Sequence, residues 1–257
     1  MTNVLVCIKR VPDTGGDVTL TADGQSVDTR RLGFMVNAHE SCAVELAVRI
    51  AADDGGTVTV LTLGTQDAVE QLRSALGVGA TSAVLIETDD PAAFGPVDVA
   101  REIAAGVAEG DSAGSPYDLV LLGNDAADTG DFQVGIRLSY LLNRPVVNGA
   151  RTLEVAGGTA TAKVAGPDGV ETYALPLPAV VTVLEGGVEP RYPSIPGRMK
   201  AKKVQVEQRT PSGTPTGSGR VRLTLPPAQP NTVEVLGEGP DAAAAVVDML
   251  QRLGVVR

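Results

Sequence analysis

Short apolar runs alternate with stretches of helical periodicity through the first half of this chain. The apolar runs are residues 3–8, 57–63, 83–87 and 118–122, and the helical patterns are residues 37–52, 67–76, 97–107 and 133–142. A strand followed by a crossover helix returns to a parallel neighbour, so four such repeats predict an α/β fold with a doubly wound, mostly parallel sheet. Aromatic residues make up only 3% of the sequence, which leaves Val, Leu, Ile and Ala to fill a core around strands buried on both faces.

The pattern changes after these repeats. Residues 151–155 and 159–164 flank Gly157-Gly158 and are predicted to form a β-hairpin insertion, since two glycines supply the positive φ that a tight hairpin turn needs. Residues 179–184 (AVVTVL) are predicted to form one more buried strand. The α/β domain is therefore expected to span residues 1–209.

Residues 210–257 are expected to form a separate C-terminal arm. Pro, Gly, Ser and Thr dominate its first part (TPSGTPTGSGR), so this part has too little apolar surface for a core and is predicted to be extended. A short amphipathic helix is predicted near residues 240–253. Its apolar stripe consists of Val246, Val247, Leu250 and Leu253. This stripe needs another surface to cover it.

The charge balance and the cysteines narrow the classes of function. The formal net charge is -10 at pH 7, so a nucleic-acid partner is not expected, because proteins that bind phosphate backbones are normally basic. The two cysteines, Cys7 and Cys42, have neither metal-like spacing nor a disulfide framework. The N-terminal sequence has no signal-peptide pattern and no apolar stretch is long enough to span a membrane, so a cytoplasmic protein without membrane insertion is expected.

Residues 123–135 (GNDAADTGDFQVG) are the first candidate for a binding site. They follow a predicted buried strand and lead into a predicted helix, and ligands of open α/β sheets bind at the carboxyl ends of strands. The start of that helix offers free N–H groups to a phosphate. Gly123 and Gly130 allow close backbone approach, and Asp128 and Gln133 are suited to the polar edges of a ligand. The stretch is neither a Walker loop nor a GxGxxG fingerprint, so an ordinary βα turn is an equally weighted interpretation of these residues alone.

Residues 189–203 (EPRYPSIPGRMKAKK) are the second candidate. Three prolines predict a stiff surface loop, and Arg and Lys cluster in it. Ile195 stands between Pro193 and Pro196, where no regular element is expected to bury it. A solvated basic loop is the simple interpretation of the charges. An apolar residue on a stiffened loop indicates instead a protein-docking anchor with a basic rim.

No catalytic constellation accompanies these two stretches. His39 is the only histidine and has no Ser or Cys nucleophile partner in a recognisable motif, so a helix-start or surface histidine is the simpler interpretation. Cys7 is expected to pack in the core, and the reactivity of Cys42 stays open. The sequence shows no metal motif and no paired-carboxylate site, so the chain is not expected to be an enzyme.

Five segments of the sequence, in this order, resemble the beta subunit of electron-transfer flavoproteins, including the related FixA proteins. They are VLVCIKRVPD (4–13), VNAHESCAVELAVRI (36–50), LRSALGVGA (72–80), DLVLLGNDAADTGDFQVG (118–135) and LPAVVTVLEGGVEPRYPSIPGRMKAKK (177–203). The E-P-R-Y…P…M-K-A-K-K run of the last segment is the most diagnostic. The resemblance implies an α/β fold of the adenine-nucleotide-binding type and a carrier subunit without catalytic residues of its own.

The resemblance also implies two cofactors. In this family the beta subunit buries one adenine nucleotide, usually AMP with a structural role, and the alpha subunit holds most of a redox FAD. No metal is implied. The positions expected to line the nucleotide pocket are Cys7, Asn37, Ala38, His39, Glu40, Leu63, Gly123, Asn124, Asp125, Ala126, Asp128, Thr129, Gly130, Asp131, Phe132, Gln133 and Val134.

The resemblance further implies three kinds of protein partner. The arm is expected to wrap the alpha subunit of a heterodimer. Residues 189–203 correspond to the recognition loop that inserts into flavin dehydrogenases, in particular acyl-CoA dehydrogenases of fatty acid β-oxidation. Electrons would then pass through the FAD to a quinone oxidoreductase. The expected docking positions are Arg191, Tyr192, Pro193, Ile195, Pro196, Arg198, Met199 and Lys200.

Two departures from the family pattern keep alternatives open. Some members place aromatic residues near the redox flavin where this chain has Thr14 and His39. The stretch AADTGDFQVG also matches neither the common form of the loop nor that of electron-bifurcating members, which hold a second FAD in place of AMP. Such a bifurcating subunit is the alternative within the family. A stand-alone adenine-nucleotide sensor or hydrolase is the alternative of another class, although a solitary domain needs neither the arm nor the Ile195 loop.

Overall fold

The computed structural model describes residues 1–13, 15, 18–227 and 233–256. Thr14, which belongs with His39 to the first departure from the family pattern, lies outside the described residues. The chain divides into a larger unit, Met1–Arg222, and a smaller unit, Leu223–Arg257. Across the described part of the chain, no helix has the length and apolar character needed to cross a membrane.

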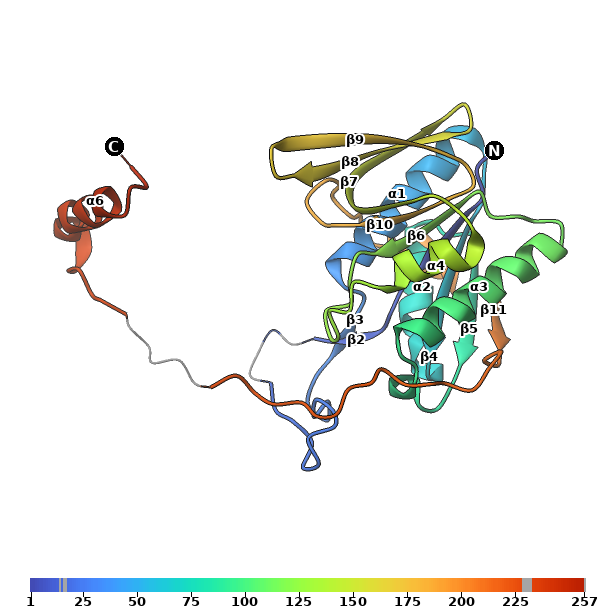
Figure 1. Cartoon of the computed structure of the whole chain (residues 1–257), viewed down its shortest axis with the longest axis horizontal. Helices are drawn as coiled ribbons and strands as arrows, with labels where there is room; N and C mark the ends of the chain where they lie inside the picture. Colours follow the sequence, from blue (N-terminus) through green and yellow to red (C-terminus); the bar gives the residue numbers. More distant parts are fainter. Residues whose placement is uncertain (14, 16–17, 228–232, 257) are drawn as a thin grey trace. The chain divides into compact units, whose positions relative to one another are not determined.

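A mostly parallel sheet of nine strands forms the centre of the larger unit (Figure 1) and confirms the predicted fold class. The strands are β1 Val4–Cys7, β4 Val58–Gly64, β5 Ser82–Glu87, β6 Leu119–Gly123, β7 Val146–Ala156, β8 Thr159–Gly166, β9 Gly169–Pro176, β10 Ala179–Val183 and β11 Val206–Arg209. Their spatial order is β11-β5-β4-β1-β6-β10-β7-β8-β9. Neighbours from β11 to β7 pair in parallel, and β8 and β9 continue the sheet antiparallel. A separate antiparallel pair joins β2 (Val11–Pro12) to β3 (Phe34–Met35).

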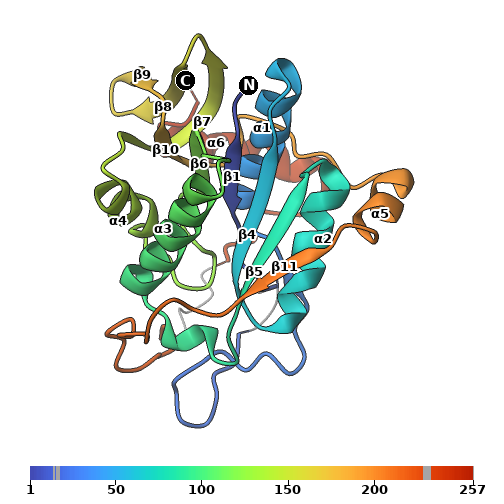
Figure 2. The ribbon, with the colours of Figure 1, turned by 90° about the vertical axis from the view of Figure 1, so that its right-hand side faces the viewer.

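Helices cover both faces of this sheet (Figure 2). The α-helices are α1 Ala38–Asp54, α2 Val69–Val78, α3 Pro96–Ser112, α4 Val134–Leu142, α5 Ile195–Ala201 and α6 Ala243–Arg252, and the 3-10 helices are η1 Gln66–Ala68, η2 Pro91–Ala93 and η3 Gly239–Ala242. Val6 and Leu72 belong to a core cluster that joins α1 and α2 to one face of the sheet. Leu5, Ile103 and Leu138 belong to a second cluster that joins α3 and α4 to the other face. Because side chains alternate along a strand, neighbouring residues of β1 pack into the core clusters on opposite faces of the sheet.

The strand order reverses beside β1. The chain runs outward from β1 to β4 and β5, and then returns to place β6 on the other side of β1. Cys7 of β1 lies opposite Leu61 of β4 and Leu122 of β6. The carboxyl ends of β1 and β6 therefore flank a topological switch point, which is where open α/β sheets bind ligands.

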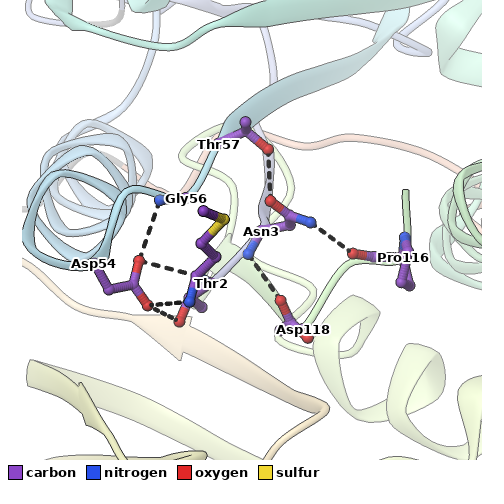
Figure 3. A network of polar contacts seen from close by, with 8 residues as sticks. Thr2, Asn3, Asp54, Gly56, Thr57, Pro116 and Asp118 are labelled. Atoms are coloured by element: carbon purple, nitrogen blue, oxygen red, sulfur yellow. Dashed lines mark hydrogen bonds and ion pairs between the residues drawn. The ribbon is translucent and has the colours of Figure 1, made fainter. Parts of the chain in front are cut away.

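Side chains fix the other end of β1 (Figure 3). Thr2 donates to Asp54 from its backbone N–H (3.0 Å) and from its hydroxyl (2.6 Å). Asn3 donates from its backbone N–H to Asp118 (2.8 Å) and accepts from the hydroxyl of Thr57 (2.8 Å). These bonds tie the end of α1 and the starts of β4 and β6 to the central strand. They support the register that brings the carboxyl ends of these strands together.

The predicted hairpin is present and is longer than expected. Gly157 and Gly158 have φ values of 56° and 77°, and they turn β7 into β8. A third strand, β9, extends the hairpin. The sequence did not predict this strand because every residue of it except Leu175 is exposed, so no apolar alternation marks it.

Two helices differ from the sequence-based expectation. The helix predicted for residues 67–76 begins as η1 and continues as α2, so Gly77 lies inside it and Gly79 forms the C-cap. The loop predicted for residues 189–203 contains the helix α5. Ser194 caps that helix by accepting from the N–H of Gly197 (3.1 Å), and a proline in the first turn of a helix loses no hydrogen bond. The prolines were interpreted as stiffening a loop, whereas one of them starts a helix.

The first part of the predicted arm is bound to α3. Glu102 is buried and accepts from the backbone N–H (2.8 Å) and hydroxyl (2.9 Å) of Ser212. Asp98 is also buried and accepts from the backbone N–H (2.9 Å) and hydroxyl (2.8 Å) of Thr216 and from the N–H of Gly217 (3.1 Å). We call residues 212–217 the strap. The strap contains no helix or strand, as predicted, and two carboxylates of a neighbouring helix hold it in place of a core.

The smaller unit contains η3 and α6, where the amphipathic helix near residues 240–253 was predicted. Val246, Val247 and Leu253 of the predicted apolar stripe are exposed, and Leu250 is half-buried.

Candidate functional site

Three segments that are distant in the sequence meet at the carboxyl ends of β1 and β6. They are Lys9, two residues after the strand β1, the N-terminus of α1 and the loop 124–133. Asn37 joins the last two, because its side chain accepts from the N–H of Glu40 (2.9 Å) and donates to the carbonyl of Asp125 (3.0 Å). Asn37 and Glu40 have the spacing of a capping box, but only half of that box is formed. The carboxylate of Glu40 accepts from the N–H of Lys9 (3.0 Å) instead of returning to Asn37.

Glu40 is a buried acid at this edge of the sheet. Burial raises its pKa to about 8, although the hydrogen bond and the charge of Lys9 oppose this shift. Gly123 packs directly against it, since a Cβ on that residue would stand 2.7 Å from Cγ of Glu40 and 3.3 Å from Cβ of His39. The close contact explains why a glycine ends β6, and it ties the loop to α1.

Two close polar contacts hold the loop in position. Lys9 Nζ lies 2.7 Å from Oδ1 of Asp128, and His39 Nδ1 lies 2.9 Å from Oδ1 of Asp125. The second contact is short but is not aligned as a hydrogen bond. Within the described ranges, neither of its two atoms has a hydrogen-bond partner. Buried polar atoms are normally satisfied, so this pair is suited to a polar group of a ligand.

The charges of the loop limit the ligands that it can accept. Asp125, Asp128 and Asp131 lie in it, and it contains neither Lys nor Arg. Lys9, which follows β1 in the sequence, is paired with Asp128. A triphosphate would meet this acidic loop without compensating cations, whereas one phosphate group needs only a few N–H donors.

The N-terminus of α4 provides such donors. Gln133 occupies the N-cap, and its side-chain oxygen accepts from the guanidinium of Arg137 (2.7 and 3.0 Å) and caps no backbone N–H. The first-turn amides of α4 therefore have no side-chain acceptor among the described residues, and they carry the positive end of the helix dipole. A Cβ on Gly135 would stand 2.3 Å from Cγ2 of Thr182, so this glycine lets the helix start close to β10.

A polar network beneath the loop was not predicted. The buried hydroxyl of Thr182 donates to Oδ1 of Asn124 (2.7 Å) and accepts from the N–H of Gly149 (2.9 Å). Asn124 also donates its backbone N–H to the carbonyl of Val183 (3.0 Å). The single hydroxyl in the apolar run AVVTVL was the available signal, because a polar residue in a fully buried strand needs a partner.

Two predicted pocket residues lie on the sheet. Cys7 ends β1, and burial raises the pKa of its thiol far above the usual range, so it packs as a neutral side chain. Leu63 of β4 is half-buried against the same core cluster. Both belong to the layer of α3 and α4, whereas α1 covers the opposite face. A ligand at this edge would therefore contact residues from both layers.

The other predicted pocket residues surround this edge with different exposures. Gly130 has a φ of 59° and donates to the carbonyl of Ala126 (2.8 Å), which turns the loop. Phe132 also has a positive φ, of 53°, and its side chain is 57% exposed. Ala38 and Thr129 are exposed.

The second predicted site lies on and around α5. Ile195 is 80% exposed, and Met199 and Tyr192 are exposed beside it in the sequence. The exposed basic residues of the segment are Arg191, Arg198, Lys200, Lys202 and Lys203. Pro193 is half-buried and Pro196 is exposed. The exposed Ile195 therefore begins a short helix and has basic residues near it in the sequence. The structure has this helix where a loop was predicted.

Arg191 differs from the other cations of this segment. Its guanidinium makes two hydrogen bonds of 2.7 Å to the carboxylate of Glu45, which is buried in α1. Its guanidinium is therefore paired within the chain, unlike the guanidinium of Arg198 and the ammonium of Lys200, which have no ion-pair partner among the described residues.

A shallow groove of about 530 Å³ lies between α3 and α4. Its lining residues are Val97, Arg101, Gln133, Ile136, Arg137, Tyr140 and Leu141. Ile136, Tyr140 and Leu141 of α4 are exposed, although most of this helix is apolar. Within the described part of the chain, no group of three or more His, Cys, Asp or Glu side chains is placed to hold a metal ion.

Comparison with known proteins gives one consistent result. Residues 26–213 match the family model of the electron transfer flavoprotein domain. A protein of Syntrophomonas wolfei named electron transfer flavoprotein subunit beta is 30% identical over 249 residues, which cover 96% of this chain and 95% of that protein. Proteins of the same name from Bacillus subtilis and Mycobacterium leprae are 34% and 36% identical, each over 80% of this chain and 78% of their own length.

Proposed function

The chain belongs to the electron transfer flavoprotein domain family, and from this membership we propose that it is the beta subunit of a heterodimeric electron-transfer flavoprotein. With an alpha subunit it would hold one FAD, which supplies the redox chemistry between a flavin dehydrogenase, such as an acyl-CoA dehydrogenase, and a quinone oxidoreductase. This chain would bind AMP as a structural nucleotide. Its residues bind, orient and dock, and none is assigned a chemical step.

Two neighbouring features support AMP as the ligand. The N-terminus of α4 has no side-chain cap, and the loop 124–133 before it is acidic. The first-turn amides of α4 have no side-chain acceptor among the described residues, so they are suited to one phosphate. Asp128 and Asp131 disfavour additional phosphates. His39 Nδ1 and Asp125 Oδ1 are buried and make no aligned hydrogen bond to each other, so both atoms are suited to the polar edge of a base or ribose.

The nucleotides released from the purified heterodimer test this assignment. We expect one AMP and one FAD per heterodimer when the denatured complex is separated by chromatography. Two FAD molecules without AMP would favour the electron-bifurcating alternative. A chain that purifies alone and colourless, with adenine nucleotide turnover, would favour the sensor or hydrolase alternative.

Two glycine variants sharpen the experiment. Gly123→Ala places a methyl group 2.7 Å from Glu40, so it should displace the loop and reduce the AMP content at least severalfold. Gly33→Ala is the matched control, because a Cβ on that residue meets nothing within 4 Å. An unchanged AMP content in Gly123→Ala would show that the nucleotide does not bind at this edge of the sheet.

We further assign dehydrogenase docking to residues 189–203, which we call the docking segment. Ile195 and Met199 offer exposed apolar surface, and Arg198 and Lys200 stand beside them in the sequence. Apolar anchors give most of the affinity of such contacts, and rim charges act mainly on the rate of encounter. A dehydrogenase surface with an apolar pocket and acidic rim fits this segment.

The alpha subunit is proposed to cover apolar surfaces that are exposed in this chain. The outward face of α4 carries Ile136, Tyr140 and Leu141, and α6 carries its own exposed stripe. Exposed large apolar side chains gathered on one helix face often mark an interaction surface, so α4 favours a partner there.

A further inference from the structure

The docking segment is held on the larger unit at three points. Near its start, Arg191 is bound by Glu45 of α1. In its middle, Gly197 lies so close to the backbone of Gly77 in α2 that a Cβ would stand 2.3 Å from that carbonyl oxygen. At the end of α5, Arg73 of α2 donates to the carbonyl of Ala201 (2.6 Å). Figure 2 shows α5 beside α2.

The contact between Glu45 and Arg191 involves a buried carboxylate, which needs charged hydrogen-bond partners. Glu45 is 1% exposed, and a buried carboxylate is costly unless charged partners satisfy it. Arg191 donates Nε to one of its oxygens and Nη2 to the other, each at 2.7 Å, and Arg49 donates Nε at 2.6 Å. The backbone N–H of Arg191 also points to this carboxylate at 3.3 Å. Burial alone would raise the pKa of Glu45, but the hydrogen bonds of Arg191 and Arg49 hold that pKa below its ordinary value.

Glu45 binds both the main chain and the side chain of Arg191. Because both the guanidinium and the N–H of Arg191 are fixed, Glu45 sets the direction in which the chain enters Tyr192 and the first turn of α5. Ile195 follows four residues later and is exposed. A segment ordered before binding loses less conformational entropy when it docks.

We infer that Glu45 is the positioning residue of the docking segment, and that it acts through Arg191 to hold Ile195 ready for the dehydrogenase. This inference rests on the proposed docking function. It separates the basic residues of the segment into two kinds. Arg191 orients the segment, whereas Arg198 and Lys200 present charge to the partner.

The test compares three variants in the FAD-loaded heterodimer. Arg191→Lys keeps the charge but loses the bidentate fork, so the docking segment should become more mobile. Ile195→Ala removes the proposed anchor and leaves the three holding points in place. Arg49→Lys is the matched control, because it alters the other cation on Glu45 and does not touch the segment.

Two measurements are made on each variant. Amide hydrogen exchange of residues 189–203 reports whether the segment is ordered. The rate at which an acyl-CoA dehydrogenase reduces the shuttle, measured against shuttle concentration, gives the half-saturation value and the maximal rate. For Arg191→Lys we expect faster exchange confined to the segment and a half-saturation value raised roughly tenfold, with the maximal rate retained. Arg49→Lys should change neither value more than about twofold.

The outcomes distinguish the inference from its premise. If Ile195→Ala raises half-saturation but Arg191→Lys changes neither exchange nor half-saturation, Glu45 does not position the segment and the inference is overturned. Faster exchange with unchanged half-saturation would overturn it equally, because order of the segment would not matter for docking. If Ile195→Ala has no effect on half-saturation, the proposed docking itself fails and the inference fails with it.

Discussion

Glu40 shows how a single residue couples the candidate nucleotide site to folding stability. Its ordinary pKa of 4.5 rises to about 8 because the carboxyl group is buried. The folded chain therefore holds this proton more tightly than the unfolded chain. The stabilising contribution is complete below about pH 4.5 and is lost as the pH rises through about 8.

Replacing this acid should remove that pH dependence. Glu40→Gln keeps an oxygen that accepts from the N–H of Lys9 but cannot ionise. We expect the free energy of unfolding to fall less steeply between about pH 5 and about pH 8.5 than in the unchanged protein, by about 1.4 kcal/mol for each pKa unit removed. Urea denaturation at both pH values measures this, and Glu70→Gln on the surface of α2 is the control. Equal slopes in the two variants would show that Glu40 does not retain its proton.

The strap has no core of its own, and the single helix α3 holds it in place. Asp98 and Glu102 are one turn apart on α3 and face the same side, so they accept hydrogen bonds from both ends of residues 212–217. Burial opposes the charge of Asp98, but the bonds from Thr216 and its neighbours hold the pKa of Asp98 below its ordinary value. The ionised carboxylate of Asp98 therefore stabilises the strap fully at pH values above the ordinary pKa of an aspartate. This stabilisation is lost as the pH falls through the lower pKa that Asp98 has in the folded chain.

Removing one carboxylate should release the strap without unfolding the sheet. Asp98→Asn replaces an acceptor oxygen by an N–H₂ group that faces the donors of Thr216 and Gly217, at a cost of about 1–3 kcal/mol. We expect limited proteolysis within the strap to become at least severalfold faster. Asp111→Asn makes the same change at an exposed position of α3 and should leave the rate unchanged. Equal cleavage rates in both variants would contradict an anchoring role.

The whole molecule combines a self-sufficient unit with a unit whose apolar surface needs a partner. The larger unit contains both core clusters. In the smaller unit, α6 carries the exposed apolar side chains of Val246 and Val247. The contacts within the chain divide it after Arg222, beyond the strap, whereas the composition changes at Thr210.

Deleting residues 223–257 tests this division. We expect the truncated chain to keep the far-UV circular dichroism and unfolding transition of the larger unit. It should lose heterodimer affinity by at least tenfold, because an apolar helix no longer covers the alpha subunit. Co-purification and flavin content measure the loss. Val247→Ser in the full chain should have a smaller effect of the same sign. A truncated chain that retains its partner and its flavin would show that α6 has another role.

The sequence alone determined the alternation of strands and helices, the parallel sheet and the two stretches that carry the candidate sites. These features are local: periodicity reports buried faces, and a binding loop follows its strand directly. Only the tertiary structure decided which distant residues meet. Glu45 and Arg191 are 146 positions apart, and Asp98 and Thr216 are 118 apart, yet each pair shares a buried carboxylate. Such contacts depend on how the layers pack around the sheet, and no pattern within a single segment specifies them.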